Sequence, residues 1–114
     1  MTNSEQMLSA LEDNDLKQAD ELFQKALKED NPETLYSLAE ELYAMGFLEQ
    51  ASTIYQQLLA QFPDEDQIRT TLADIAVSNG QYDDALNLLT DITPESNAYA
   101  ESLLTAADVY QTMG

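Results

Sequence analysis

The chain lacks cysteine, histidine and tryptophan altogether. Without cysteine and histidine it has no disulfide framework, no zinc site of the usual kinds, no cysteine or histidine nucleophile and no imidazole acid–base pair. Any catalysis would have to rest on carboxylates, hydroxyls or lysine. The absence of cysteine also suits a reducing compartment.

Basic residues are scarce: four Lys and Arg stand against 22 Asp and Glu among 114 residues, which gives a formal net charge of -18. A chain this negative repels phosphate backbones and anionic lipid headgroups, so neither nucleic acid nor a membrane is an expected partner. The imbalance grows along the chain, from a net -3 over residues 1–28 to -15 over residues 29–114. A cationic partner is the natural complement.

Long apolar runs are absent too. No stretch approaches the roughly 20 apolar residues of a membrane span, and the opening MTNSEQM has neither the basic residues nor the apolar segment of a secretory signal. We therefore expect a cytoplasmic protein. Because 44% of residues are hydrophobic and Gly and Pro number only three each, the chain has enough apolar material to fold. Its length fits a single domain over residues 1–114.

A sequence repeat with a constant period runs through the chain. Gly46, Gly80 and Gly114 recur at equal intervals, and Ala51 and Ala85 are separated by the same interval. The apolar residues between the glycines follow helical spacing: Leu35, Leu38, Ala39 and Leu42, then Ala51, Ile54, Tyr55, Leu58 and Leu59. This spacing predicts two amphipathic helices per unit. Since no segment alternates like a strand, the predicted fold class is all-α.

Start and stop signals place the helices. They are expected near residues 4–12, 16–28, 32–45, 48–61, 65–78, 82–91 and 94–113. Five capping signals mark helix starts: Thr2 with Glu5, Asp15 with Gln18, Asn31 before Pro32, Asp64 with Gln67, and Thr93 before Pro94. Gly46 and Gly80 stand where the first helix of a unit should stop in a left-handed conformation. Connections this short favour an antiparallel stack of hairpins.

The unit that starts at Pro32 carries Leu35, Leu38, Ala39 and Leu42, then Gly46, Ala51, Tyr55 and Pro63. This set, and the period of the glycines, resemble the tetratricopeptide repeat (TPR), a helix–turn–helix unit of fixed length. The next unit keeps the pattern at Leu72, Ala73, Gly80, Tyr82, Ala85 and Leu89 but departs from it at Arg69 and Ala76. The last unit matches at Leu103, Ala106, Ala107 and Tyr110. The first unit is clear only in its second helix, at Leu16, Ala19, Phe23 and Ala26, and has Asn14 in place of glycine. The resemblance implies a right-handed superhelical stack of antiparallel helix hairpins, a TPR-like α-solenoid of about three and a half repeats. The repeats would span residues 1–31, 32–65, 66–99 and, in part, 100–114.

Small residues recur where such a fold brings helices close together, at Ala39, Ala51, Ala73, Ala85 and Ala107. A longer side chain at these positions would cost roughly 1 to 3 kcal/mol through overpacking. We expect Tyr55, Tyr82 and Tyr110 in the core as well.

The family generally binds peptides or partner helices in a concave groove lined by the first helix of each hairpin, and the resemblance implies the same surface here. The residues on that surface would be Glu33, Tyr36, Glu40, Tyr43, Thr70, Asp74, Val77, Glu101, Leu104, Asp108 and Gln111. Glu40, Asp74 and Asp108 recur with the period of the repeat, which predicts a row of carboxylates with one per hairpin. The alternative is that these acids form only a solvated face of a very acidic chain, and that Tyr36 and Tyr43 are aromatics common to generic repeats.

One subgroup of the family holds the C-terminal carboxylate of a partner with Lys, Arg and Asn on these helices. This chain has acids there instead, and Lys17, Lys25 and Lys28 fall on the second helix of the first hairpin. An acidic peptide would meet uncompensated like charge. We therefore expect a partner segment that contains Lys or Arg, helped by cation–π contact with Tyr36 and Tyr43.

Catalytic, metal and cofactor sites are not expected. Groove carboxylates could reach the glycosidase separation of about 5 to 9.5 Å, but there is no Trp for sugar stacking, and an open groove would not raise the pKa of an acid. Asp13-Asn14-Asp15 begins like a calcium loop, yet the loop glycine is missing and Gln24 stands where the bidentate Glu belongs. No glycine-rich phosphate loop occurs.

The sequence therefore predicts a non-catalytic scaffold that binds a basic or amphipathic segment of another protein in an acidic groove. The alternative is a structural or self-association module, because a last helix with Leu103, Ala107 and Tyr110 would normally be covered by a partner helix. We expect either that the chain is the N-terminal piece of a longer repeat protein or that two copies form a homodimer through the C-terminal helix.

Overall fold

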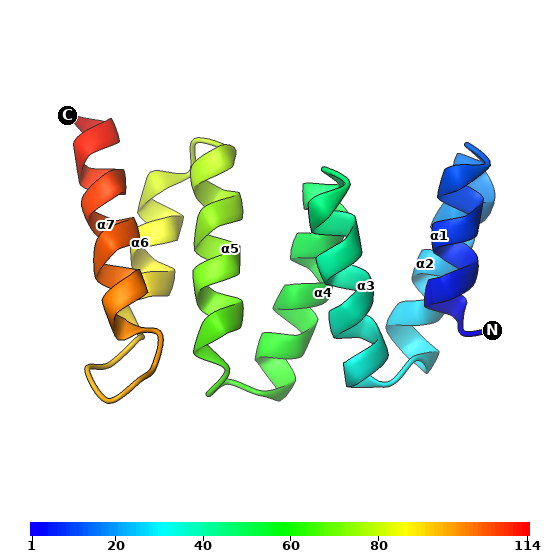
Figure 1. Cartoon of the computed structure of the whole chain (residues 1–114), viewed down its shortest axis with the longest axis horizontal. Helices are drawn as coiled ribbons and strands as arrows, with labels where there is room; N and C mark the ends of the chain where they lie inside the picture. The colour runs from blue at the N-terminus through cyan, green and yellow to red at the C-terminus, as the bar shows by residue number, and fades with distance from the viewer. The chain divides into compact units, whose positions relative to one another are not determined.

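The structure is a computed structural model that describes all 114 residues, and it is all-α (Figure 1). The helices are α1 (Asn3–Glu12), α2 (Leu16–Glu29), α3 (Pro32–Ala44), α4 (Leu48–Gln61), α5 (Asp66–Ser78), α6 (Tyr82–Thr90) and α7 (Tyr99–Met113). The all-α prediction is confirmed, and the bounds of the first six helices agree with the prediction to within one residue. None of the seven helices combines the length and apolar character that a membrane span requires. The chain forms two compact units, Met1–Ile54 and Tyr55–Gly114.

Three of the predicted helix caps are present. The Thr2 hydroxyl accepts a hydrogen bond from the Glu5 amide at 3.0 Å, and the Glu5 carboxylate accepts one from the Thr2 amide at 3.3 Å, which completes a capping box. Asp15 accepts from the Gln18 amide at 3.2 Å, and the Asn31 side chain accepts from the Thr34 amide at 2.8 Å. These side chains satisfy amide groups that the first turn of a helix leaves without a partner.

The cap predicted at Asp64 is wrong. Helix α5 begins at Asp66, so its capping position is Glu65, whose side chain makes no capping hydrogen bond. A turn precedes the helix, in which the Glu65 amide donates to the Phe62 carbonyl at 3.1 Å. This turn places Asp64 one residue too early to cap α5.

The turns within the hairpins use the left-handed conformation as predicted. Gly46 has a φ of +89° and Gly80 a φ of +75°. Asn14 replaces glycine in the first hairpin and is the one residue other than glycine with a positive φ, at 58°. Asparagine tolerates this conformation better than most residues with a side chain.

The predicted start of the last helix is also wrong. Pro94 does not open α7, because residues 91–98 form an irregular connection. The Ser96 amide donates to the Thr93 carbonyl at 3.0 Å, and the Ser96 hydroxyl accepts from the Ala98 amide at 3.1 Å. Hydrogen bonds of this kind, between a serine and the neighbouring backbone, compete with helix formation. The buried Ile92 and Ala98 anchor the two ends of the connection in the core, so α7 begins at Tyr99.

In the unit Met1–Ile54, α1 and α2 pack as a hairpin and α3 also contacts α1. Most of the buried apolar side chains come from the inner faces of these helices: Met7, Ala10, Ala19, Leu22, Phe23, Ala26, Leu35, Leu38, Ala39 and Leu42. A polar contact adds to this packing. The carboxylate of Asp30, just after α2, accepts hydrogen bonds from the Ser4 amide at 2.9 Å, the Ser4 hydroxyl at 2.6 Å and the Asn3 side-chain amide at 3.1 Å. Asp30 thus joins the end of α2 to the start of α1.

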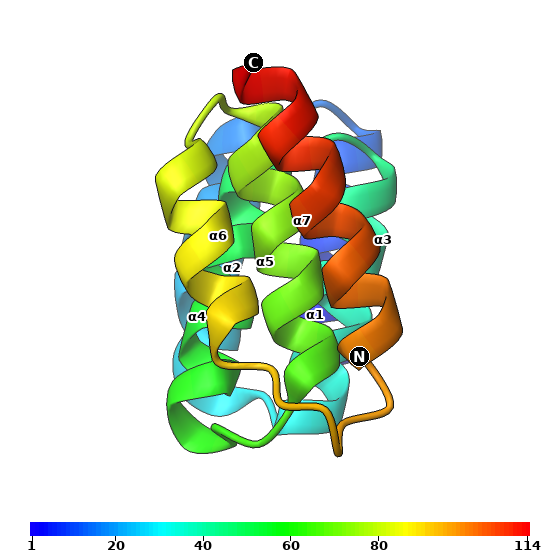
Figure 2. The same ribbon diagram turned by 90° about the vertical axis from the view of Figure 1, so that its left-hand side faces the viewer.

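In the unit Tyr55–Gly114, α5 and α6 form a hairpin and α7 packs against both, as Figure 2 shows. The shared core contains Ala73, Ala76, Ala85, Leu89, Ile92, Ala98 and Val109. Tyr55 is buried and Tyr82 packs against this core, as predicted. The prediction is wrong for Ala107 and Tyr110, which are exposed on α7.

Replacing Asp30 tests the contact between α2 and α1. The change Asp30→Ala leaves the partly buried Ser4 amide and hydroxyl without their acceptor, which should lower the free energy of unfolding by about 1 to 3 kcal/mol. The neighbouring Glu29→Ala is a matched control, because Glu29 is exposed. Urea unfolding of both variants measures the difference, and equal midpoints would show that the Asp30 contact adds nothing to stability.

Candidate functional site

The predicted groove residues lie on α3 in one unit and on α5 and α7 in the other. On α3 they are Glu33, Tyr36, Glu40 and Tyr43; on α5, Thr70, Asp74 and Val77; on α7, Glu101, Leu104, Asp108 and Gln111. Within each helix these residues are three or four positions apart, a spacing that keeps them on one face. We call the residues on α7 the acidic stripe of α7.

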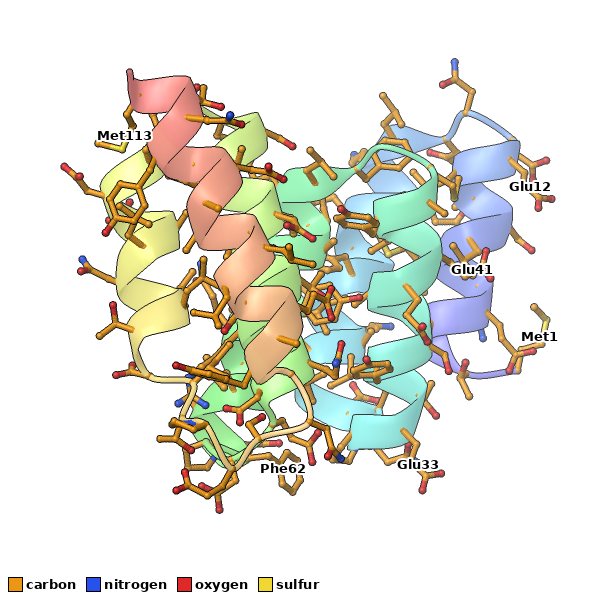
Figure 3. The ribbon with its side chains drawn as sticks, turned by 60° about the vertical axis from the view of Figure 1, so that its left-hand side comes forward. Met1, Glu12, Glu33, Glu41, Phe62 and Met113 are labelled. Atoms are coloured by element: carbon orange, nitrogen blue, oxygen red, sulfur yellow. The ribbon has the colours of Figure 1, made fainter.

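On α3 this face is open to solvent. Glu33 and Glu40 are exposed, and Tyr43 keeps 37% of its surface accessible. Tyr36 is half-buried. Figure 3 shows the Glu33 side chain pointing outward from the first turn of α3. This face therefore offers carboxylates and a tyrosine ring side by side.

The same unit also contains a hollow that was not predicted from the sequence. It lies between α1 and α3 and has a volume of about 240 Å³. Leu8 and Leu38 form its apolar lining, and Glu5 and Glu41 are the acids that line it. Helix α1 does not follow the repeat pattern, so its residues could not be aligned with those of the later repeats. The available signal was Glu41, which directly follows the predicted Glu40.

In the other unit, α5 and α7 bring two predicted acids close together. Asp74 on α5 is half-buried, and the negative charge of Glu101 on α7 acts on it. Burial is the larger cause and repulsion from Glu101 the smaller one, and both raise the pKa of Asp74 above its ordinary value. The expectation that an open groove would not raise the pKa of its acids is therefore wrong for Asp74. Leu104, 70% exposed, and Asp108, also exposed, continue the acidic stripe beyond Glu101.

Thr70 was expected on an open surface, but it is buried. Its side chain is 2% exposed, and its hydroxyl donates a hydrogen bond to the Gln67 carbonyl at 2.8 Å. Val77 is half-buried and packs against the core of its unit. Of the three predicted residues on α5, Asp74 is thus the one that keeps a charged group partly accessible.

Few of the acids have a cation beside them. Arg69 forms an ion pair with Asp66 at 3.0 Å and also donates a hydrogen bond to the Pro63 carbonyl. Arg69 therefore holds the turn before α5, where the repeat pattern would place a large apolar side chain. Lys17, Lys25 and Lys28 lie on α2, as predicted, and are exposed. No three acids gather in a way that could hold a metal ion.

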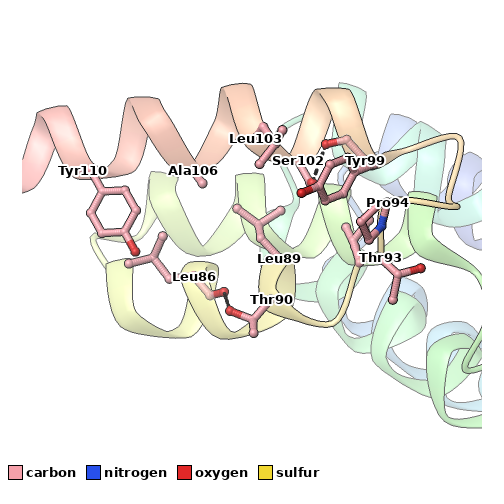
Figure 4. Close-up of a pocket in the computed structure, with 11 residues that line it drawn as sticks. Leu86, Leu89, Thr90, Thr93, Pro94, Tyr99, Ser102, Leu103, Ala106 and Tyr110 are labelled. Atoms are coloured by element: carbon pink, nitrogen blue, oxygen red, sulfur yellow. Dashed lines mark hydrogen bonds between the residues drawn. The ribbon is translucent and has the colours of Figure 1, made fainter.

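A further hollow lies between α6 and α7, as Figure 4 shows, and holds about 370 Å³. It is lined by Leu86, Leu89, Ile92, Leu103, Ala106 and Tyr110, among others. Leu103 is 53% exposed and Tyr110 is 62% exposed. We call this apolar surface the α6–α7 groove. Leu103 and Tyr110 were the residues that the sequence indicated as an uncovered face.

Comparison with known proteins agrees with this architecture. A family model described as "Tetratricopeptide repeat protein 21 ARM repeat" matches residues 2–113. The chain belongs to this tetratricopeptide repeat family. It is 37% identical over 79 residues to mouse tetratricopeptide repeat protein 21A and 33% identical over the same length to the human protein, in each case across 67% of this chain and 6% of the relative. It is also 30% identical over 90 residues to the TPR repeat-containing protein YpiA of Bacillus subtilis, across 79% of this chain and 21% of that protein.

The relatives are thus much longer than the matched stretch, and the match bears on a helical repeat region. Membership in this family indicates a protein-interaction scaffold.

The raised pKa of Asp74 predicts a pH-dependent stability. The fold disfavours the ionised form of Asp74, so ionised Asp74 lowers the free energy of unfolding. This loss of stability is present above the raised pKa and disappears as pH falls below the ordinary pKa of 3.8. Asp74→Asn should therefore be more stable than the wild type near neutral pH, and this advantage should vanish in acid. Thermal unfolding measured from pH 3 to pH 7 checks the trend.

Glu101→Gln is the control for the repulsion between Glu101 and Asp74. In that background the advantage of Asp74→Asn should shrink, because only burial still acts on the carboxyl group. An advantage that did not change with pH in either background would contradict the assignment.

Proposed function

We propose that this chain is a non-catalytic scaffold that binds a Lys- or Arg-containing segment of another protein along its acidic first-helix faces. The observation that carries the proposal is the pair of carboxylates on α5 and α7. Asp74 is half-buried beside the negative charge of Glu101, and no cation compensates them. A site that holds like charges together at a cost in free energy gains when a positive group is placed between them.

The surroundings of this pair suit a lysine or arginine side chain. The ammonium or guanidinium group would interact with Asp74 and Glu101 in a partly desolvated place, where electrostatic attraction is stronger than in bulk water. The exposed Leu104, three residues after Glu101, offers apolar contact to the aliphatic part of the same side chain. Asp108 follows on the same face and would receive a second cation.

The face of α3 has the same chemistry. Glu33 and Glu40 are exposed on it together with Tyr43, whose ring can stack on a cationic side chain. A net charge of -18 would also speed the encounter with a basic segment at low ionic strength. Family membership supports the general role as a scaffold.

A binding experiment with a flexible peptide of lysine, glycine and serine tests the proposal, because such a peptide forms no stable helix. Its affinity should fall steeply as salt rises, since exposed charges are screened beyond a Debye length of about 8 to 10 Å in ordinary buffer. The triple variant Glu40→Gln, Asp74→Asn, Asp108→Asn should weaken binding about 10-fold or more.

The matched control removes the same charge elsewhere. Glu21→Gln, Asp64→Asn and Asp84→Asn change three exposed acids on α2, on the turn before α5 and on α6. If the two triple variants lose the same affinity, binding depends on net charge alone, and the proposed surface is wrong.

Self-association through the C-terminal helix is the second candidate. The observation that favours it is the exposure of Leu103 and Tyr110 on α7. Apolar association of this kind would be indifferent to salt or strengthened by it, in contrast to the binding of a cationic peptide. Sedimentation equilibrium at low and high salt separates the two functions, since a monomer under both conditions excludes the homodimer.

A further inference from the structure

We infer that the hollow between α1 and α3 is a second docking site, which receives an extended segment of a partner protein with a basic, an apolar and a basic residue at alternate positions. We call it the α1–α3 hollow. Its lining consists of Thr2, Ser4, Glu5, Leu8, Thr34, Ser37, Leu38 and Glu41. The inference follows from the place of the hollow, from its apolar floor and from the position of its two acids.

The α1–α3 hollow lies on another face of α3 than the surface of the proposed function. Both of its walls belong to the unit Met1–Ile54, in which α1 and α3 contact each other. At 3.6 residues per turn, its stripe on α3 is centred about 130° around the helix from the predicted groove residues of α3. That stripe consists of Thr34, Ser37, Leu38 and Glu41.

The floor of the hollow is apolar and has room for one side chain. Leu38 is 1% exposed, and Leu8 is half-buried. The hollow has a volume of about 240 Å³, whereas an apolar cavity of about 150 Å³ is enough for benzene. One leucine or phenylalanine side chain of a partner therefore fits above Leu8 and Leu38.

An acid lies at each end of the hollow. Glu5 is in the first turn of α1 and Glu41 in the last turn of α3, and Figure 1 shows that the two helices run in the same direction. The amide and the hydroxyl of Thr2 donate to Oε1 of Glu5 at 3.3 and 3.2 Å, which holds this carboxylate in place and leaves Oε2 for a ligand. Glu41 lies between α3 and α1, as Figure 3 shows.

The charges around the hollow favour a partner with a cation on each side of the apolar residue. Neither α1 nor α3 contains Lys or Arg, so these helices supply no cation for Glu5 or Glu41. Ser4, in the lining, donates a hydrogen bond to the carboxylate of Asp30 at 2.6 Å, which brings a third acid next to the hollow. A Lys or Arg at each end of the bound segment complements these acids.

Two features favour an extended segment over a helix. Because α1 and α3 contact each other, side chains rather than a third helix reach Leu38 between them. An extended backbone also has N–H and C=O groups that need partners, whereas those of a helix are already paired. The hydroxyls of Thr2 and Ser4 are used within the fold. Those of Thr34 and Ser37 remain to donate to the segment and accept from it.

The length of the hollow sets the pattern of the segment. From Thr34 to Glu41 its wall on α3 extends about 10 Å. In an extended chain every second side chain points to the same side, at intervals of about 7 Å. Three alternate side chains therefore cover the hollow, the apolar one at the centre and a flexible basic one at each end. This pattern is Lys-x-Leu-x-Lys.

Three peptides of equal length test the inference. The first carries Lys-Ser-Leu-Ser-Lys between glycine and serine ends, the second has Lys-Leu-Ser-Ser-Lys, and the third has serine in place of leucine. Only the first directs leucine and both lysines to one side. It should bind the chain about 10-fold tighter than either of the others. In an NMR titration its largest chemical-shift changes should map to Leu8, Ser37, Leu38 and Glu41.

A double variant tests the role of the two acids. Glu5→Gln with Glu41→Gln removes both charges, and glutamine keeps the capping box because its side chain also accepts from the Thr2 amide. This variant should weaken binding of the first peptide about 10-fold. The matched control, Glu21→Gln with Glu49→Gln, removes two exposed acids on α2 and α4 and should leave binding within about twofold. Circular dichroism should show the same melting temperature for both variants.

Each result decides for or against the inference. Equal binding of the first two peptides, or equal losses from the two double variants, would overturn it. Shift changes confined to Tyr43, Asp74 and Glu101 would place the peptide on the faces of the proposed function and would also overturn it. Binding of the first peptide at Leu38, without binding of the flexible lysine, glycine and serine peptide, would remove the proposed function and leave this inference standing.

Discussion

The close approach of helices at buried alanines is the constraint on which the rest of the structure depends. Ala39, Ala51, Ala73 and Ala85 are each fully buried, and the larger apolar side chains pack around them. Since a protein interior has no spare volume, a side chain without bulk at these points sets how near two helices can lie. The glycine turns allow each hairpin to reverse within a few residues. Together they determine which faces of α3, α5 and α7 remain free for other contacts.

The free faces of these helices carry acids, and little of the chain's negative charge is neutralised within the fold. The ion pair of Arg69 with Asp66 is used to hold a turn, while Asp74 lies half-buried beside the charge of Glu101. Electrostatics therefore opposes folding here and favours association with cations, whereas the alanine-based packing supplies the stability. The α6–α7 groove adds a surface lined mainly by apolar side chains.

The sequence predicted most of the fold because the repeat ties local signals to a register. Gly46 and Gly80 marked the turns, and the burial of Ala73 followed from its position in the unit. The errors arose where hydrogen bonds or neighbouring helices decide the outcome. Ser96 holds a turn that displaces the start of α7, which the Pro94 signal alone could not reveal. Helical spacing predicted Thr70 on the groove side, yet its side chain is buried, because burial depends on what packs nearby and spacing carries no information on that.

Comparison of Ala73 with Ala107 tests the central claim most directly. The two alanines occupy the same position in successive repeats, yet Ala73 is fully buried and Ala107 is exposed. If helix coverage determines the role of this position, Ala73→Leu should lower the free energy of unfolding by about 1 to 3 kcal/mol through overpacking, and Ala107→Leu should change it by less than about 0.5 kcal/mol. Chemical denaturation of the two variants measures this difference, and equal losses at both positions would contradict the account.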